Sequence, residues 1–221
     1  MAIYVTSDAH GHVRALDEAL SKISLMSDDT LYVLGDMIDR GPDPVGVIKL
    51  VRSLPNARVL KGNHEQIMLD AIIGQDPLDA ETWDINGGWT TREQLNDMEF
   101  EAYEELVRWM AALPLYAVVE TEERPYLLVH AGIETEAARA FLLEHDVDCS
   151  DGAGAVGADR ELLKQMLAVQ SSDDLLWIRH GYWDAPTGLL SSEGKGPVVV
   201  SGHTPTVSLG RYCEVGGLAG L

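Results

Sequence analysis

The sequence predicts a single α/β domain that spans all 221 residues. Three observations support this fold class. Short β-branched runs bounded by Gly, Asp or Pro are typical of strands that are buried on both faces. Amphipathic stretches of helical length separate the first three runs. A chain of this length can also bury one conventional core. We therefore expect an α/β domain that begins with a parallel sheet.

Six runs are predicted to form strands. They lie at residues 2–6, 31–34, 57–60, 115–120, 126–129 and 198–201. The first three alternate with two predicted helices, so the chain begins with a β-α-β-α-β pattern. Such a pattern implies parallel strands that are joined by right-handed crossovers.

The helices of this first segment are predicted from spacing and from a favourable start. Residues 13–25 place Leu16, Leu20 and Ile23 near helical spacing, and residues 44–54 open with a proline, which suits the first turn of a helix. Residues 65–113 are predicted to be a mostly helical insert. Glycine-containing segments at 74–77 and 86–88 are expected to break it.

Two further helices are expected in the second half of the chain, at residues 134–145 and 159–169. Both follow segments that read as strand or loop. No internal repeat or heptad pattern is found, which argues against a solenoid or a coiled coil.

Composition and charge narrow the classes of function. The chain is 46% hydrophobic and carries a formal net charge of −20, which argues for a folded domain and against a protein that tracks a nucleic-acid backbone. Its two cysteines, Cys149 and Cys213, lie outside every motif and support neither a disulfide framework nor a thiolate metal site. We expect a cytoplasmic protein, because no signal-like start or membrane-spanning run is found. We expect neither nucleic-acid nor membrane partners, and the sequence does not indicate the oligomeric state.

Five short polar motifs follow apolar runs, in an order that matches the predicted strands. They are residues 8–10 (DAH), 35–41 (GDMIDRG), 62–65 (GNHE), 130–132 (HAG) and 202–204 (GHT). Ligands of open α/β sheets gather beyond the carboxyl ends of the strands, so we expect the five motifs to meet. Their Asp, Asn and His side chains are oxygen and imidazole donors for divalent ions. This donor set predicts hydrolysis by a water that a metal activates.

The spacing suggests two metal positions. Asp8 and His10 flank one residue and are expected to hold the first ion, with Asp36 as a carboxylate bridge to the second. The second ion is expected to be completed by residues that each follow a strand, namely Asn63, His130 and His203. Two such ions can clamp a phosphoryl group while solvent between them attacks in line.

The remaining polar residues are given catalytic and binding roles. His64 is the candidate general acid, and Asp39 is expected to hold its ring. Arg40 is expected to bind phosphate oxygens, because a guanidinium matches a phosphate with two hydrogen bonds. Arg179 is the candidate for a second phosphate clamp, and Asn63 is placed to contact the substrate as well.

Simpler interpretations stand beside these roles. Asp36 alone would be interpreted as a helix cap, and Asp39 with Arg40 as a surface ion pair. Trp177 would be a core aromatic residue that the stem of Arg179 covers. Glu65 is expected to act only through the electrostatics of a helix start. Because all five motifs follow apolar runs in order, the metal-site interpretation is favoured for Asp36, Asp39 and Arg40.

With these motifs the chain resembles the bacterial phosphoprotein phosphatases of the calcineurin-like metallophosphoesterases, and in particular the bacteriophage lambda protein phosphatase. The GDxxDRG and GNHE blocks are the specific ones, and residues 86–89 (NGGW) and 177–179 (WIR) also resemble family segments. The resemblance implies a β-sandwich flanked by helices, in four layers α/β/β/α. It also implies two divalent ions, usually Mn²⁺ in bacterial members, with Fe, Zn or Ni as other choices.

The activity implied by the resemblance is a serine/threonine protein phosphatase, with tyrosine as a further target and phosphorylated proteins or peptides as substrates. One alternative is a symmetrical hydrolase of dinucleoside polyphosphates such as diadenosine tetraphosphate. Members of that group usually carry Gln at the position of His10, which favours the phosphatase. A catalytically silent phosphoprotein-binding module is a further alternative.

The family resemblance also carries an expectation about the C-terminus. Family chains normally continue beyond the GHT block through a hairpin that closes one sheet. Here residues 214–218 are expected to begin that hairpin without its return strand.

Overall fold

The computed structural model describes most of the chain, as two compact units. The units are Met1–Pro114 and Leu115–Leu221, and each is treated by itself below. That the whole chain forms one domain stays a prediction. The described residues are 1–74, 76–150, 152–183 and 185–205.

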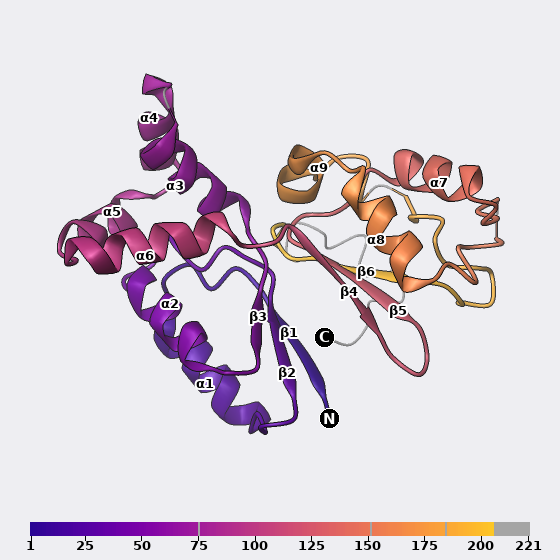
Figure 1. Ribbon diagram of the computed structural model, residues 1–221, viewed down its shortest axis with the longest axis horizontal. Helices are drawn as coiled ribbons and strands as arrows, with labels where there is room; N and C mark the ends of the chain where they lie inside the picture. Colours follow the sequence, from indigo (N-terminus) through magenta and orange to yellow (C-terminus); the bar gives the residue numbers. More distant parts are fainter. Residues whose placement is uncertain (75, 151, 184, 206–221) are drawn as a thin grey trace. The chain divides into compact units, whose positions relative to one another are not determined.

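A parallel three-stranded sheet forms the centre of the first unit (Figure 1). Its strands are β1 (Ile3–Thr6), β2 (Thr30–Val33) and β3 (Ala57–Val59), in that spatial order. Tyr4 pairs with Leu31, and Leu31 pairs with Ala57. The predicted β-α-β-α-β start is confirmed, and the carboxyl ends of all three strands lie at one edge of the sheet.

Two helices cross between these strands and lie along the sheet in Figure 1. They are α1 (Val13–Ile23) and α2 (Pro44–Ser53). Helix α2 begins with a proline at its first turn, and the side chain of Asp43 accepts a hydrogen bond from the Gly46 backbone N–H at 2.9 Å. Leu16 and Val47 are buried in the core of this unit.

Four helices form the insert that was predicted between residues 65 and 113. They are α3 (Asn63–Ile73), α4 (Pro77–Ile85), α5 (Trp89–Asn96) and α6 (Phe100–Ala111). Both predicted breaks are confirmed. The first break ends at Asp76. The side chain of Asp76 accepts a hydrogen bond from the Leu78 N–H at 2.9 Å and so caps α4. The insert buries Met68, Trp83 and Met110 in the same core as the sheet.

The described residues of the second unit form a mixed sheet and three helices. Strands β4 (Tyr116–Glu120) and β5 (Pro125–Val129) form an antiparallel hairpin, and β6 (Val198–Val200) pairs in parallel with β5. Helices α7 (Thr135–Glu144) and α8 (Arg160–Ala168) match the predicted ones.

Helix α9 (Ser172–Trp177) was not predicted. It has only six residues, which is too short for a periodic signal, and the Ser171 hydroxyl starts it by accepting from the Asp174 N–H at 3.0 Å.

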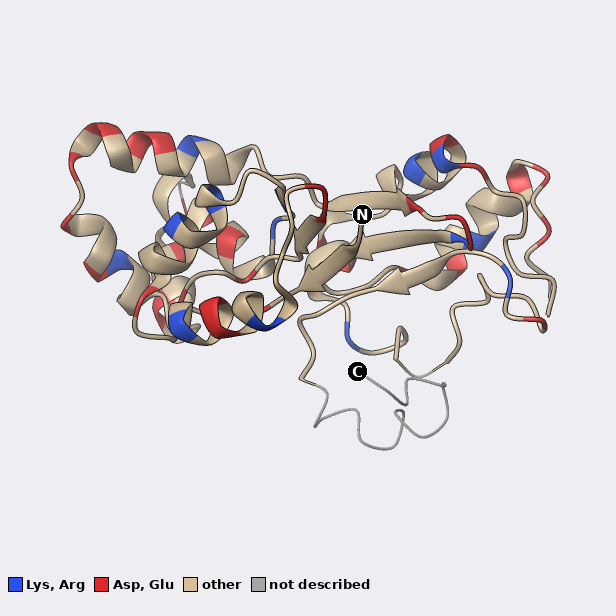
Figure 2. Cartoon of the chain, turned by 90° about the horizontal axis from the view of Figure 1, so that it is seen from below, with Lys and Arg blue, Asp and Glu red and all other residues tan. Residues whose placement is uncertain are grey.

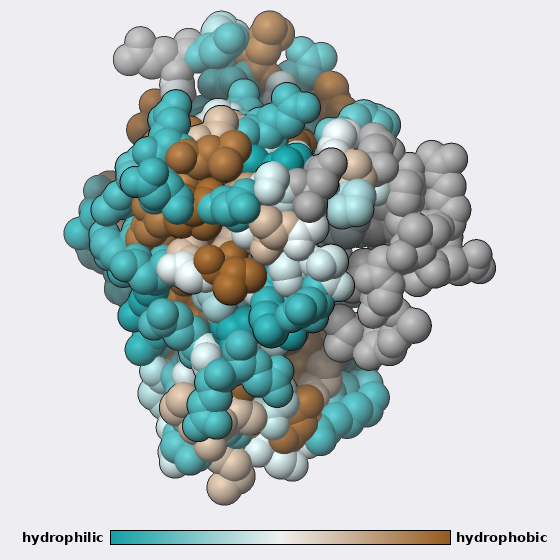
Figure 3. All heavy atoms as spheres, turned by 90° about the vertical axis from the view of Figure 1, so that its right-hand side faces the viewer, coloured by the Kyte–Doolittle hydropathy of each residue, from teal (hydrophilic) through white to brown (hydrophobic). Residues whose placement is uncertain are grey.

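The predicted fold class is confirmed as a mixed α/β fold with helices and two small sheets. Acidic residues, which outnumber basic ones in the sequence, are spread along the helices and loops of both units (Figure 2). On the face seen in Figure 3, hydrophobic side chains come in small groups among hydrophilic ones. Within the described residues, every helix is too short or too polar to cross a membrane. The expected C-terminal hairpin lies outside the described residues.

Candidate metal and phosphate site

The turns that follow β1 and β2 hold one another through their backbones. The Asp8 N–H donates to the carbonyl of Gly35 at 3.1 Å, and the His10 N–H donates to that of Asp36 at 2.9 Å. Asp8, His10 and Asp36 all have positive φ, at 56°, 40° and 53°. Residues other than glycine rarely adopt a positive φ, and those that do cluster at functional sites. The two turns are thus one unit of structure rather than two independent loops.

Glu65 ties a third turn, the one after β3, to this pair. Its Oε2 accepts from the backbone N–H groups of Asp36 and Gly62, each at 2.8 Å, and its Oε1 accepts from that of Met37 at 2.8 Å. The bond to Gly62 is the expected helix-start contact. The other two bonds were not foreseen, and they make the fully buried Glu65 a clamp that places Asp36.

A further bond closes the same turn: the His64 N–H donates to Asp36 Oδ1 at 3.0 Å. The close approach of these turns also requires a glycine at position 35. Gly35 has a φ of +92°, and a Cβ there would lie 2.3 Å from the Gly62 nitrogen. The side chain of Asp36 is therefore positioned by three chain segments at once.

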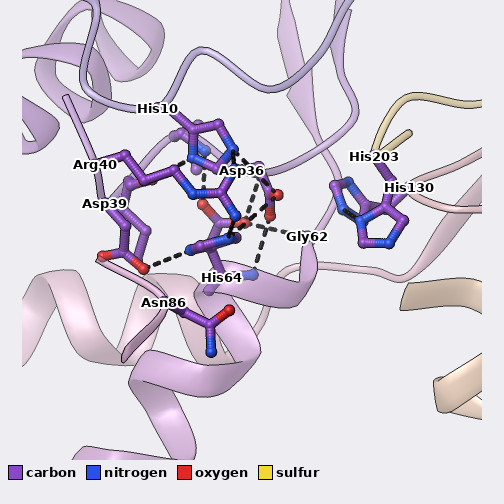
Figure 4. Close-up of polar contacts among 12 residues, drawn as sticks. His10, Asp36, Asp39, Arg40, Gly62, His64, Asn86, His130 and His203 are labelled. Carbon is purple, nitrogen blue, oxygen red and sulfur yellow. Dashed lines mark hydrogen bonds and ion pairs between the residues drawn. The ribbon is translucent and has the colours of Figure 1, made fainter. Parts of the chain in front are cut away.

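His10, Asp36 and His64 converge closely enough to hold an ion (Figure 4). Their donor atoms all lie within 4.8 Å of one another. His10 Nδ1 contacts the Ile38 carbonyl at 2.9 Å, and a carbonyl can only accept, so Nδ1 carries the proton and Nε2 presents a lone pair. That Nε2 lies 3.6 Å from Asp36 Oδ2. Imidazole nitrogen beside carboxylate oxygen fits a borderline divalent ion.

The electrostatics of this cluster agree with a cation site. Burial raises the pKa of Asp36 well above its ordinary value, and the nearby charges of Glu65 and Asp8 raise it further. Burial also raises the pKa of Glu65, although its three N–H bonds act in the opposite direction. Burial lowers the pKa of His10 to about 4. A bound divalent ion would stabilise both ionised Asp36 and neutral His10.

His64 is held by Asp39 as the sequence predicted. Its Nδ1 lies 2.7 Å from Asp39 Oδ2, and both side chains are fully buried. Asp39 is held in turn by two residues of the insert that sequence analysis missed. The Thr91 hydroxyl donates to Asp39 Oδ1 at 2.6 Å, and the Trp83 indole N–H lies 3.1 Å from the same oxygen. Asp39 is therefore not a surface residue, and the interpretation as a surface ion pair is wrong.

Arg40 lies at the exposed rim of this buried cluster. Its Nη1 is 2.9 Å from His10 Nε2, and its Nη2 is 2.8 Å from His64 Nε2 (Figure 4). Since a guanidinium only donates, both Nε2 atoms act as acceptors in this arrangement. The Arg40 N–H donates to the carbonyl of Gly87 at 3.0 Å, so the break between α4 and α5 positions the arginine.

Asp8 and Asn63 are placed at the same strand ends. Asp8 lies near enough to raise the pKa of Asp36. Asn63 is 2% exposed and is the first residue of α3. Their positions fit the predicted ligand roles, which remain predictions.

The second unit brings His130 and His203 together. His130 Nε2 lies 3.1 Å from His203 Nδ1, both residues are buried, and the Gly202 N–H donates to the His130 carbonyl at 2.8 Å (Figure 4). Two imidazoles at this distance can share one ion. That Asp36 and Asn63 join them at one ion stays a prediction.

Arg179 is exposed, and its Nη1 donates to the Thr204 hydroxyl at 3.3 Å. This contact brings it next to the GHT block in the structure, where a phosphate clamp was expected.

Comparisons with known proteins agree with this chemistry. The model of the calcineurin-like phosphoesterase family matches residues 1–217. A symmetrical bis(5'-nucleosyl)-tetraphosphatase of Erwinia tasmaniensis is 32% identical over 136 residues, which are 60% of this chain and 45% of that protein. The protein of the same name from Proteus mirabilis is 28% identical over 219 residues, which are 96% of this chain and 68% of that protein. The chain spans about half the length of several curated relatives that it matches.

Among solved structures, a metallophosphoesterase from Sphaerobacter thermophilus is 27% identical, with a TM-score of 0.42 over 59% of this chain and 46% of that one. The finer resemblance to the bacteriophage lambda phosphatase stays a prediction. The match of the family model along nearly the whole sequence is decisive for the family, whose members use divalent metal ions. The chain belongs to the calcineurin-like phosphoesterase family.

Proposed function

We propose that this protein is a symmetrical dinucleoside tetraphosphate hydrolase that depends on divalent metal ions. The observation that carries the proposal is the similarity to two proteins named symmetrical bis(5'-nucleosyl)-tetraphosphatase, one of which aligns with 96% of this chain. In the sequence, the histidine at position 10, where the dinucleotide hydrolases usually carry glutamine, favoured a protein phosphatase. An alignment along nearly the whole chain outweighs one position, so the dinucleotide alternative is better supported than the phosphatase.

The residues of the first unit have distinct parts in this proposal. His10 and Asp36 would hold a metal ion together with Asp8, and Mn²⁺ is the ion that we expect. Bound divalent ions would neutralise phosphate charge and lower the pKa of a water for attack. In the overall reaction one water cleaves a central phosphoanhydride bond, and two nucleoside diphosphates are released.

Arg40 is proposed to bind the phosphate chain. It is exposed, and its two terminal nitrogens point at His10 and His64, so a phosphate entering there meets the guanidinium first. An arginine that turns to a phosphate would leave His64 Nε2 facing the substrate. This nitrogen could then hold the proton that the leaving oxygen takes, while Asp39 keeps the ring oriented through Nδ1.

The identity of the leaving group distinguishes the proposal from the protein phosphatase. A nucleoside diphosphate leaves readily as an anion, whereas a serine side chain leaves as a strongly basic alkoxide that needs a proton. The His64–Asp39 pair is an observation in the structure that favours phosphomonoesters as a second candidate substrate class, because an alkoxide needs a general acid more than an anhydride does.

The test is a direct comparison of substrates. The purified protein is assayed with Mn²⁺ on diadenosine tetraphosphate, a phosphoserine peptide and a phosphotyrosine peptide, with a chelator as the metal control. We expect the highest kcat/KM on the dinucleotide and adenosine diphosphate as its only product. Faster hydrolysis of either peptide would refute the proposal in favour of the protein phosphatase. Adenosine triphosphate with monophosphate as products would refute the symmetrical cleavage.

Two variants examine the assigned roles. His64→Asn should lower turnover on the phosphoserine peptide far more than on the dinucleotide, because a leaving alkoxide depends on a proton donor more than a leaving diphosphate does. Asp36→Asn should weaken Mn²⁺ binding in calorimetry, since it removes a buried carboxylate charge. Equal losses on both substrates in the first variant, or unchanged metal stoichiometry and affinity in the second, would overturn these assignments.

A further inference from the structure

Trp177 has a position that its sequence context did not predict. The simpler interpretation of the sequence made it a core aromatic, but in the structure it is 40% exposed, while its neighbours Leu175 and Leu176 are buried. It is the last residue of α9, after which the chain turns to an extended conformation at Ile178. Placing a large indole in solvent gives up the stabilisation that its burial would bring. The exposed part of the ring is an aromatic surface of the kind on which planar groups stack.

The indole lies beside His203, one of the expected metal ligands. The two ring centroids are 6.1 Å apart and the ring planes meet at 84°, so His203 does not stack on the indole. Arg179 follows two residues later and bonds to Thr204, the neighbour of His203 in the chain. An aromatic surface, a cation and an imidazole thus lie together within the second unit.

The backbone that carries Trp177 is fixed by the strand end where His130 lies. The Ala131 N–H donates to the Leu175 carbonyl at 2.8 Å. The chain after α9 also packs against Gly132, where a Cβ would lie 2.7 Å from Ile178 Cγ2. The glycine of the HAG motif thus permits this close approach. The indole is anchored next to the expected ligands rather than carried on a free loop.

We propose that Trp177 is a stacking surface for a nucleobase of the substrate. This inference rests on the proposed function, because a dinucleoside polyphosphate places a base one ribose away from each end of its phosphate chain. When the phosphate chain binds at Arg179 and His203, a base that lies one ribose away can reach the face of the Trp177 indole. Base stacking on an aromatic side chain tolerates any base. A phosphoserine peptide has no planar group to use this surface, so Trp177 would favour nucleotides over peptides.

The test separates stacking from a structural role by comparing substrates with and without a base. Trp177→Leu and Trp177→Phe are assayed on diadenosine tetraphosphate and on inorganic tetraphosphate, with Phe100→Leu, another exposed aromatic, as the matched control. We expect Trp177→Leu to raise KM for the dinucleotide about 5- to 100-fold relative to tetraphosphate, the range for loss of one stacked base. Trp177→Phe, which keeps an aromatic face, should change this ratio less. An unchanged ratio in Trp177→Leu, or an equal change in Phe100→Leu, would overturn the inference.

A binding measurement distinguishes failure of this inference from failure of the proposed function. Titration calorimetry compares adenosine diphosphate with pyrophosphate in the Mn²⁺-loaded protein, without turnover of a dinucleotide. Tighter binding of the nucleotide, lost in Trp177→Leu, supports the stacking surface even if diadenosine tetraphosphate is not hydrolysed, in which case only the proposed function fails. Equal binding of the two ligands by the wild-type protein overturns the stacking surface even if the dinucleotide is hydrolysed.

Discussion

The buried imidazole of His10 should make the metal-free protein lose stability in mild acid. The desolvation of the ring, whose side chain is 12% exposed, lowers its pKa from 6.5 to about 4. The bond to the Ile38 carbonyl opposes this shift, while the electrostatic effects of His64 and Arg40 add to it. Below pH 6.5 the unfolded chain takes up a proton at this histidine that the folded protein does not bind until about pH 4. Stability from His10 is thus complete above pH 6.5 and is lost as the pH falls to about 4.

The size of the effect follows from the gap between the two pKa values. A gap of about 2.5 pH units corresponds to about 3 kcal/mol, because one unit is worth about 1.36 kcal/mol. Asp36, whose pKa is raised, acts with the opposite sign, since a raised carboxyl pKa adds stability as the pH falls. The contribution of His10 must therefore be isolated by comparing variants and not read from the wild-type curve alone.

The assay is urea unfolding followed by circular dichroism, in a chelating buffer, at pH 7.0 and pH 4.5. Between these pH values the wild-type protein should lose about 2 to 3 kcal/mol more unfolding free energy than His10→Gln, whose side chain does not titrate. His12→Gln, at an exposed position two residues along the chain, is the matched control and should behave as wild type. An equal loss in the wild type and in His10→Gln would refute the argument from burial.

Three other substitutions test the contacts that place the site. Glu65→Gln should cost about 2 kcal/mol in urea unfolding, because an amide cannot accept all three backbone N–H bonds that the carboxylate accepts. It should also weaken Mn²⁺ binding in calorimetry, and unchanged affinity would contradict the clamp on Asp36. Trp83→Phe removes the indole N–H that lies 3.1 and 3.2 Å from the two carboxylate oxygens of Asp39, and it should lower kcat several-fold on a phosphoserine peptide but less on diadenosine tetraphosphate, whereas equal losses on both substrates would indicate a packing role only. Gly132→Ala should lower the unfolding free energy by about 1 to 3 kcal/mol, since the new methyl group would overlap Ile178; a variant as stable as wild type would show that the segment moves freely.

Local sequence patterns were sufficient for most of the secondary structure. All six strands that the structure describes were predicted, because β-branched runs between turn residues need no distant contact to be recognised. The breaks in the helical insert were also predictable from local sequence, since Gly74 and Gly87 each interrupt a stretch with a helical pattern. The six-residue helix α9 was missed because it completes too few turns to show a period.

Several site contacts were also expected from the sequence. The pair of His64 with Asp39 follows from two motifs that end neighbouring strands, and the structure has them 2.7 Å apart. His130 with His203 follows in the same way, from β5 and β6, which pair in parallel. Carboxyl ends of adjacent parallel strands meet at one edge, so polar residues placed there are brought together.

Short-range periodicity and turn chemistry are local properties of the sequence, so they predict the strands, the helices other than α9 and the residue types at the strand ends. The residues that hold Asp39 in place became apparent only in the folded protein. Asp39 is bound by Trp83 and Thr91, which lie 44 and 52 positions further along the chain. The exposure of Trp177 was decided in the same way, by the packing of the segment around it. Contacts between residues so far apart in the sequence form only when their segments pack together, so no local sequence pattern can predict them.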